Sequence, residues 1–140
     1  MSAAPIILPF KGIAPNIHPH AFIAPGAAII GDVTIGKDSN IWFGCVLRGD
    51  VQSITVGERT NIQDGTVVHV TRETGPTQIG SGITIGHQAL LHACSLKDDC
   101  FIGMGATVMD DAVVESGGML AAGALLTPRK TLPCGQLWAG

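Results

Sequence analysis

Charged and aromatic side chains are scarce in this chain of 140 residues, and tyrosine is absent. Charged residues make up 14% of the sequence, with 8 Lys and Arg against 11 Asp and Glu, so the formal net charge is −3. Arg129 and Lys130 form the only adjacent basic pair. Because the chain lacks a basic stripe that would neutralise a phosphate backbone, we predict no nucleic-acid partner.

Signals for export or membrane insertion are also missing. No basic region precedes the apolar residues near the N-terminus, and the uncharged stretch near Ser116 to Pro128 is too short to span a bilayer. We therefore expect a soluble, cytoplasmic protein with no membrane partner.

The four cysteines, Cys45, Cys94, Cys100 and Cys134, are widely spaced and form no CxxC pair. This spacing argues against a disulfide framework. We interpret all four as structural or incidental residues rather than as metal ligands.

What the chain has instead is a repeat, in which an aliphatic residue recurs every six positions with a few insertions. Four positions after most of these aliphatic residues comes a small or apolar residue, such as Ala27, Cys45 or Ala89. The aliphatic repeat residues are Ile17, Ile23, Ile29, Ile35, Ile41, Leu47, Val56, Ile62, Val68, Ile79, Ile85, Leu91, Leu96, Ile102, Val108, Val114, Leu120, Leu126 and Leu132.

A period of six fits neither an α-helix nor a simple alternating strand. Hexapeptide repeats are the signature of a parallel β-helix, in which each unit is a short strand plus a corner and three units complete a coil. The composition agrees, because 46% of the residues are hydrophobic and 19 glycines and 8 prolines supply corners. We predict an all-β chain with one domain, residues 1–140, in about six to seven coils.

Three units per coil place every third repeat residue on the same face of the predicted prism. On one face the repeat residues are followed directly by the outward residues Arg48, His69 and His92. We predict that these three side chains form a column. Adjacent strands lie about 4.8 Å apart, so the two imidazoles can share one ion. The insertions at residues 48–55 and 71–77 are predicted to be loops.

His87 belongs to the neighbouring face, in a predicted column with Phe43 and Asp64. A single prism therefore need not bring all three histidines together. A parallel cyclic trimer would do so, because it sets the corner of one prism against the face of the next. We predict a shared site, with His69 and His92 from one chain and His87 from its neighbour.

Three neutral imidazoles plus one open position form the ligand set of a catalytic zinc site. An isolated outward histidine is more often an ordinary polar surface residue, and we interpret His18 and His20 in that way. The joint placement of the other three favours metal ligation.

Four segments together resemble the gamma-class carbonic anhydrase family: IWFGCVLRGD at residues 41–50, NIQDGTVVHV at 61–70, IGHQALLHAC at 85–94 and FIGMGATV at 101–108. The resemblance covers nearly the whole chain. It implies a left-handed parallel β-helix, a known exception to the right-handed rule for parallel crossovers. It also implies a homotrimer that hydrates carbon dioxide to bicarbonate with a metal-bound hydroxide, the metal being zinc or, alternatively, ferrous iron or cobalt.

The resemblance assigns roles residue by residue. His69, His87 and His92 match the family's metal ligands, divided between subunits. Arg48, Asp50 and Asp64 match residues whose ion pairs hold the trimer interface. Gln63 matches the residue that hydrogen-bonds the metal-bound water or hydroxide, and Asn61 lies in the same motif.

The chain departs from the family pattern in its proton route and at its C-terminus. Val51 follows Asp50 where some active members carry a glutamate, and the loop after His69 holds one acid, Glu73, as the candidate proton shuttle. The C-terminal α-helix common in the family is expected to be absent. We therefore expect weak hydration activity.

Two other functions stay open at this point. The first is a metal-dependent thioesterase or another hexapeptide enzyme that acts on coenzyme A esters, because the same hydroxide would attack a thioester. The second is a non-catalytic trimeric scaffold tied together by metal, which the missing acidic relay favours.

Overall fold

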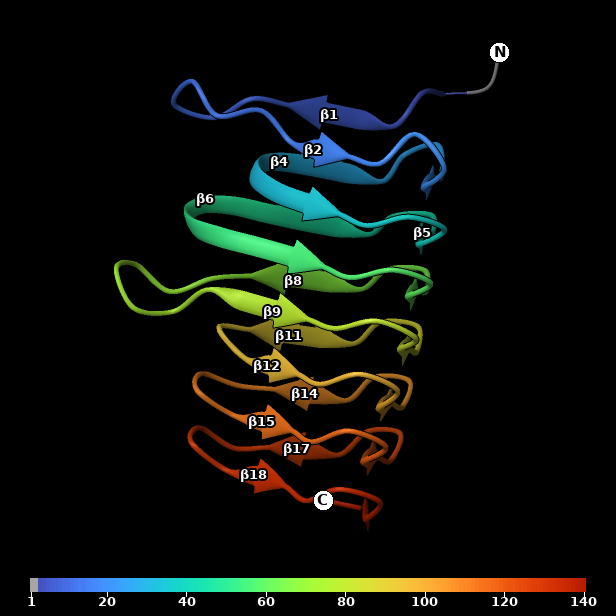
Figure 1. Ribbon diagram of the computed structural model, residues 1–140, viewed down its shortest axis with the longest axis vertical. Coiled ribbons are helices and arrows are strands. Elements are labelled where there is room, and N and C mark those ends of the chain that lie inside the picture. Colours follow the sequence, from blue (N-terminus) through green and yellow to red (C-terminus); the bar gives the residue numbers. More distant parts are fainter. Residues whose placement is uncertain (1–2) are drawn as a thin grey trace.

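The structure, a computed structural model, describes residues 3–140 as a stack of short parallel strands that coil along one axis (Figure 1). It is a left-handed parallel β-helix of about seven turns, as predicted. The first described residues lie at one end of the stack and the last at the other. Residues 3–140 contain no helix, so they also contain none that is long and apolar enough to cross a membrane.

The strands are short because each one ends at a corner of the coil. In chain order they are β1 (Ile6–Leu8), β2 (Asn16–Ile17), β3 (Phe22–Ile23), β4 (Ala28–Ile35), β5 (Asn40–Ile41), β6 (Val46–Val56), β7 (Asn61–Ile62), β8 (Val67–His69), β9 (Thr77–Ile79), β10 (Thr84–Ile85), β11 (Leu90–His92), β12 (Ser95–Leu96), β13 (Phe101–Ile102), β14 (Thr107–Val108), β15 (Val113–Val114), β16 (Met119–Leu120), β17 (Leu125–Leu126), β18 (Thr131–Leu132) and β19 (Leu137–Trp138).

Each strand pairs in parallel with the strand one coil away, and the repeat residues set the register. Ile62 is the partner of Ile41 on one side and of Ile85 on the other. The paired strands make a 12-stranded sheet, which covers two faces of the prism, and a 7-stranded sheet on the third face. Because the side chains of a strand alternate between faces, this register points every repeat residue into the interior.

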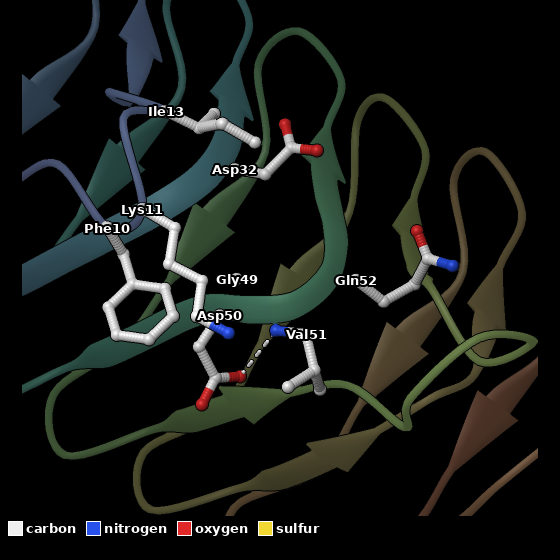
Figure 2. A pocket seen from close by; sticks show the side chains of 8 residues that line it. All are labelled: Phe10, Lys11, Ile13, Asp32, Gly49, Asp50, Val51 and Gln52. Atoms are coloured by element: carbon white, nitrogen blue, oxygen red, sulfur yellow. Dashed lines mark hydrogen bonds between the residues drawn. The ribbon is translucent and has the colours of Figure 1, made fainter.

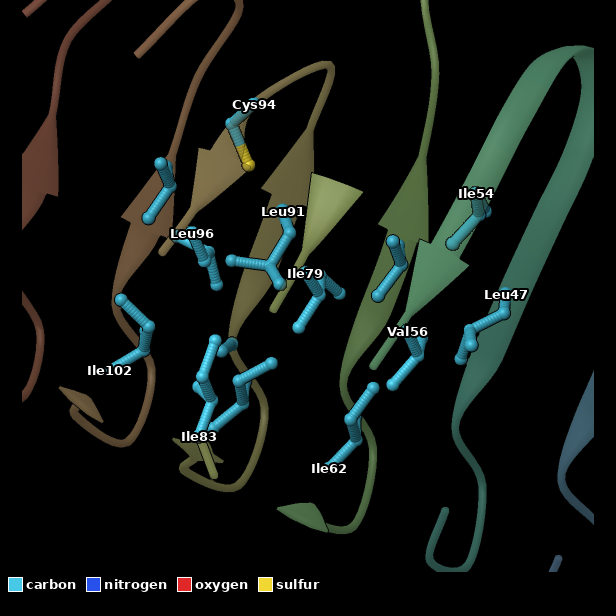
Figure 3. Close-up of a cluster of buried hydrophobic side chains, with 14 of the residues drawn as sticks. Leu47, Ile54, Val56, Ile62, Ile79, Ile83, Leu91, Cys94, Leu96 and Ile102 are labelled. Carbon is cyan, nitrogen blue, oxygen red and sulfur yellow. The ribbon is translucent and has the colours of Figure 1, made fainter. Parts of the chain in front are cut away.

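The core is a continuous aliphatic column, part of which is drawn in Figure 3. All the repeat residues are buried except the first two, Ile17 and Ile23, which are partly buried near the N-terminal end. The small residues four positions later are buried as well, as Ala27, Cys45 and Ala89 show. Large and small inward side chains therefore alternate around each coil and pack against one another in the core.

The insertion after Leu47 is not the loop that we predicted. It belongs to β6, an 11-residue strand that continues around the corner and pairs with β4 across an irregularity between Gly31 and Val33. Gly31 has a φ of 76°, and a Cβ built on it would overlap the carbonyl oxygen of Gly49. Only glycine lets the two backbones approach so closely, and the ladder therefore continues through the corner.

The second insertion forms a loop between β8 and β9, as predicted, and it projects beyond the stack (Figure 1). Its ends are held together by the pairing of Thr71 with Gly75, whose two backbone hydrogen bonds measure 2.8 and 3.2 Å. The loop therefore leaves the prism directly beside His69.

Candidate metal centre

His69 and His92 lie in register on adjacent coils, as predicted from the repeat. They end β8 and β11, which pair in parallel, and their Cα atoms are ladder partners. The ring centroids are 5.2 Å apart, and Nδ1 of His69 lies 3.2 Å from Nε2 of His92. Two imidazoles therefore converge on one point at the surface of a single chain.

A carboxylate holds the other nitrogen of each ring. His69 Nε2 lies 2.9 Å from Asp50 Oδ1, and His92 Nδ1 lies 2.7 Å from Asp110 Oδ1. An ionised carboxylate only accepts hydrogen bonds, so each neutral imidazole donates its N–H to the carboxylate. The two nitrogens that face each other then each carry a lone pair rather than a proton.

Hydrogen bonds keep the two carboxyl groups ionised. Burial alone would raise the pKa of Asp50, but the hydrogen bond from His69 and the charge of Arg48 outweigh it, and the pKa falls below its usual value. Burial likewise acts to raise the pKa of Asp110, and hydrogen bonds from Thr71 and His92 lower it overall. Both side chains are therefore acceptors at neutral pH.

The donor set fits a small divalent cation. Two lone pairs 3.2 Å apart repel each other unless a cation or a proton lies between them. Zinc binds imidazole nitrogens at 2.0–2.1 Å in tetrahedral geometry, which places two ligand nitrogens about 3.3 Å apart. A carboxylate behind each ligating imidazole is also the usual arrangement around metal-bound histidine. The side chains of His69 and His92 are 21% and 32% exposed, so an ion and a further ligand have access.

One chain does not bring His87 to this point. His87 lies in the corner after β10, where its Nδ1 is 3.0 Å from Asp64 Oδ2. Backbone hydrogen bonds connect this corner to those of Asp64 and Phe43, so the predicted column is confirmed. Among residues 3–140 no three His, Cys, Asp or Glu side chains converge as a metal site. His87 is 47% exposed and faces away from the coil.

Asn61 and Gln63 lie beside His87 rather than beside the paired histidines. With Trp42 and Asp64, these three residues line a surface pocket of about 260 Å³. Within the described residues, Oδ1 of Asn61 is buried and has no hydrogen-bond partner. An unpaired buried polar atom is costly, so this oxygen lacks the compensation that buried acceptors ordinarily have.

Arg48 and Asp50 form an ion pair within the chain. Arg48 is therefore linked to His69 through Asp50: the Arg48 guanidinium binds Asp50, and Asp50 in turn holds His69. Sequence reasoning missed this contact, and it missed Asp110 altogether. The signal for Asp110 was its place, two residues after the repeat residue Val108, in the corner that follows His92 by one coil.

A second pocket, of about 220 Å³, has Asp50 among its lining residues (Figure 2). Val51 lines it and donates its backbone N–H to Asp50 Oδ1 over 2.9 Å. The side chain after Asp50, where the family resemblance suggested that a glutamate could relay protons, is thus apolar in this chain. The pocket is lined by Phe10, Lys11, Ile13, Asp32, Gly49, Asp50, Val51 and Gln52.

Glu73 lies at the tip of the loop between β8 and β9. Its backbone has a φ of 68°, and its carbonyl oxygen accepts a 2.8 Å hydrogen bond from Nε2 of Gln52. The side chain is exposed. The backbone of the tip is therefore anchored, and the carboxylate is solvated.

The cysteines take no part in this centre. All four are free thiols, with Cys45, Cys94 and Cys100 buried and Cys134 exposed. Burial raises the pKa of Cys94 and of Cys100 to about 12 in each case. Among the described residues no disulfide links them.

Comparison with known proteins adds a family context. The chain matches the bacterial transferase hexapeptide (six repeats) profile over residues 14–49. It is 52% identical to gamma carbonic anhydrase 1, mitochondrial, of Arabidopsis thaliana, over 91% of this chain and 48% of the plant protein. It is 42% identical to a carbonic anhydrase of Geobacillus kaustophilus, over 80% of this chain and 61% of that protein.

A solved structure is similar over most of its length. The crystal structure of a hexapeptide transferase family protein from Anaplasma phagocytophilum superposes with a TM-score of 0.92 at 57% identity, covering 96% of this chain and 79% of that one. By contrast, the chain spans about half the length of the Arabidopsis relative.

Proposed function

Because the chain belongs to the gamma-class carbonic anhydrase family of hexapeptide-repeat proteins, we propose that it catalyses the reversible hydration of carbon dioxide to bicarbonate at a metal centre. One observation carries the proposal: the lone pairs of His69 and His92 face each other over 3.2 Å, and each ring is held from behind by a carboxylate. A metal ion between the two nitrogens would relieve the repulsion of their lone pairs and would have room for further ligands.

The third ligand in this proposal is His87 of a neighbouring copy. Its exposed imidazole and its distance from the other two histidines support a cyclic homotrimer in which each centre lies between two chains. Arg48, Asp50 and Asp64 would then help to hold the interface. Zinc suits three neutral imidazoles best, and ferrous iron or cobalt also binds such a set.

Zinc at this centre would supply Lewis acidity, which lowers the pKa of water to near 7. The residues of the chain do the rest. Asp50 and Asp110 would keep the two ligating lone pairs aimed at one point. Gln63, which lines the pocket beside His87, would orient the reacting water, and Asn61 lines the same pocket. The indole of Trp42 offers an apolar wall for carbon dioxide.

Hydration releases one proton for each bicarbonate formed, and that proton must reach the solvent. Glu73 is the acid on the loop beside His69, and we propose it as the shuttle. Its carboxylate is solvated, and Val51 supplies no second acid. We therefore expect proton transfer rather than attack on carbon dioxide to limit turnover.

Metal content and hydration rate, measured on the same preparation, test the proposal. Full-length protein purified without added metal is expected to hold about one ion per chain, because a threefold assembly has as many shared sites as chains. Stopped-flow assays are expected to show hydration that His92→Ala abolishes together with the metal. His20→Ala is the matched control, because that histidine lies outside the centre and is exposed.

Two results would contradict the proposal in different ways. Protein that holds less than about one ion per three chains would exclude the metal centre. A full complement of metal without hydration would favour the scaffold or the thioesterase.

A further inference from the structure

The Asp110 side chain contacts both His92 and Thr71, and Thr71 lies 39 residues earlier in the chain than Asp110. Its Oδ1 accepts the N–H of His92 Nδ1, and its Oδ2 accepts the hydroxyl of Thr71. Asp110 lies in the corner after β14, one coil beyond His92. It belongs to none of the segments that carried the family resemblance.

The backbone holds this corner in place from both sides. The Asp111 N–H donates to the carbonyl oxygen of Ala93 over 2.8 Å, and the Asp110 carbonyl accepts from the N–H of Arg129 over 2.9 Å. On the His92 side, the Ala93 N–H donates to the His69 carbonyl over 3.2 Å. The carboxylate therefore stands at a defined height beside the His92 ring.

The two hydrogen bonds have separate effects. The bond from His92 fixes the tautomer, with the proton on Nδ1 and the lone pair on Nε2, which lies 3.2 Å from His69. The bond from Thr71 fixes the rotation of the carboxylate. Thr71 also begins the loop that carries Glu73, and its pairing with Gly75 closes that loop.

We propose that Asp110 and Thr71 are positioning residues for the metal centre: Asp110 fixes the tautomer and orientation of His92, and Thr71 fixes Asp110 and attaches the loop to it. This inference rests on the proposed function, since it concerns the ligand that His92 would supply. Asp50 does the equivalent for His69, but its carboxylate is also occupied by Arg48. Asp110 is the only such support of His92 among the described residues.

Asp110→Ala and Asp110→Asn test the proposal against the matched control Asp111→Asn. Asp111 is exposed and has a φ of 59°, a conformation that asparagine tolerates. The first readout needs no metal: nitrogen NMR of the full-length apo protein, which reports the tautomer of His92. The second is cobalt, whose affinity and visible spectrum are measured by titration at a matched oligomeric state.

Asp110→Ala is expected to lose the Nδ1–H tautomer and to bind cobalt about 10- to 100-fold more weakly, with an altered spectrum. Asp110→Asn is expected to keep the tautomer, because its amide oxygen still accepts the imidazole N–H. Thr71→Val is expected to weaken cobalt binding by about 2- to 10-fold, because one supporting hydrogen bond is lost. The control is expected to match the wild type.

Wild-type tautomer and wild-type cobalt affinity in Asp110→Ala would overturn the inference and leave the proposed function standing. An unmutated protein that binds no cobalt would overturn the metal centre and this inference together. The two failures are distinguished by the behaviour of the wild type.

Discussion

At the residue scale, a neutral imidazole has one lone pair, and its surroundings decide which nitrogen carries it. Asp50 and Asp110 direct both lone pairs of the His69 and His92 pair toward the same point. The repeat alone placed the two rings side by side. Asp50 in the insertion after Leu47 and Asp110 in the corner after β14 turn two adjacent surface histidines into a candidate pair of ligands.

Burial makes the thiols behave as hydrophobic side chains. Cys94 and Cys100 have a pKa of about 12, raised by burial, so near pH 8 only about one thiol in 10⁴ is ionised. Cys134 is exposed. With a thiol reagent at pH 8 we expect one cysteine per chain to react quickly in the native protein. All four should react in denaturant, and a second fast thiol in the native state would contradict this prediction.

At the scale of the single element, polar residues inside the corners connect one coil to the next. Thr60 is fully buried; its hydroxyl donates to the Gly80 carbonyl over 2.8 Å and accepts from the Ile83 N–H over 3.3 Å. Ser39 donates to the Gly57 carbonyl in the same manner. The corners leave backbone groups that no strand pairs, and these hydroxyls satisfy them.

Thr60→Val tests this role of the corner. Valine has nearly the same shape, so the loss is the hydrogen bonding of Gly80 and Ile83, and we expect the free energy of unfolding to fall by about 1–3 kcal/mol. Thr55→Val, on the exposed side of β6, is the control and should change it by less than about 0.5 kcal/mol. Urea denaturation of both variants and of the unmutated protein measures these changes. A Thr60→Val variant as stable as the unmutated protein would show that the buried hydroxyl contributes nothing.

At the scale of the whole molecule, the proposed site is incomplete in one chain, since His87 lies on a different face from the other two histidines. His69→Ala chains and His87→Ala chains should each lose metal on their own. When the two are mixed in equal amounts and reassembled, random association places an intact His87 beside an intact pair at about one site in four. We therefore expect metal content to recover to about a quarter of the wild-type value.

A second mixture serves as the control for the shared site. His69→Ala chains mixed with His92→Ala chains should recover no metal, because no chain then carries both members of the pair. Recovery in this control, or none in the first mixture, would count against a site divided between chains.

Most of the fold was predictable because a parallel β-helix repeats a local rule. Each six-residue unit specifies its own inward side chain, and stacking of adjacent coils does the rest. The prediction failed after Leu47, where β6 replaces the expected loop. That outcome depends on the close approach of Gly31 to Gly49, a contact between coils that spacing does not reveal.

The sequence by itself determined the period, the inward residues and therefore the adjacency of His69 and His92, because register follows directly from the repeat. Only the tertiary structure decided what surrounds them. Asp110 reaches His92 from the next coil and Thr71 reaches Asp110 from a loop, through side-chain directions that no periodicity specifies. The tautomers, and with them the proposed metal site, thus depend on long-range contacts that the repeat does not specify.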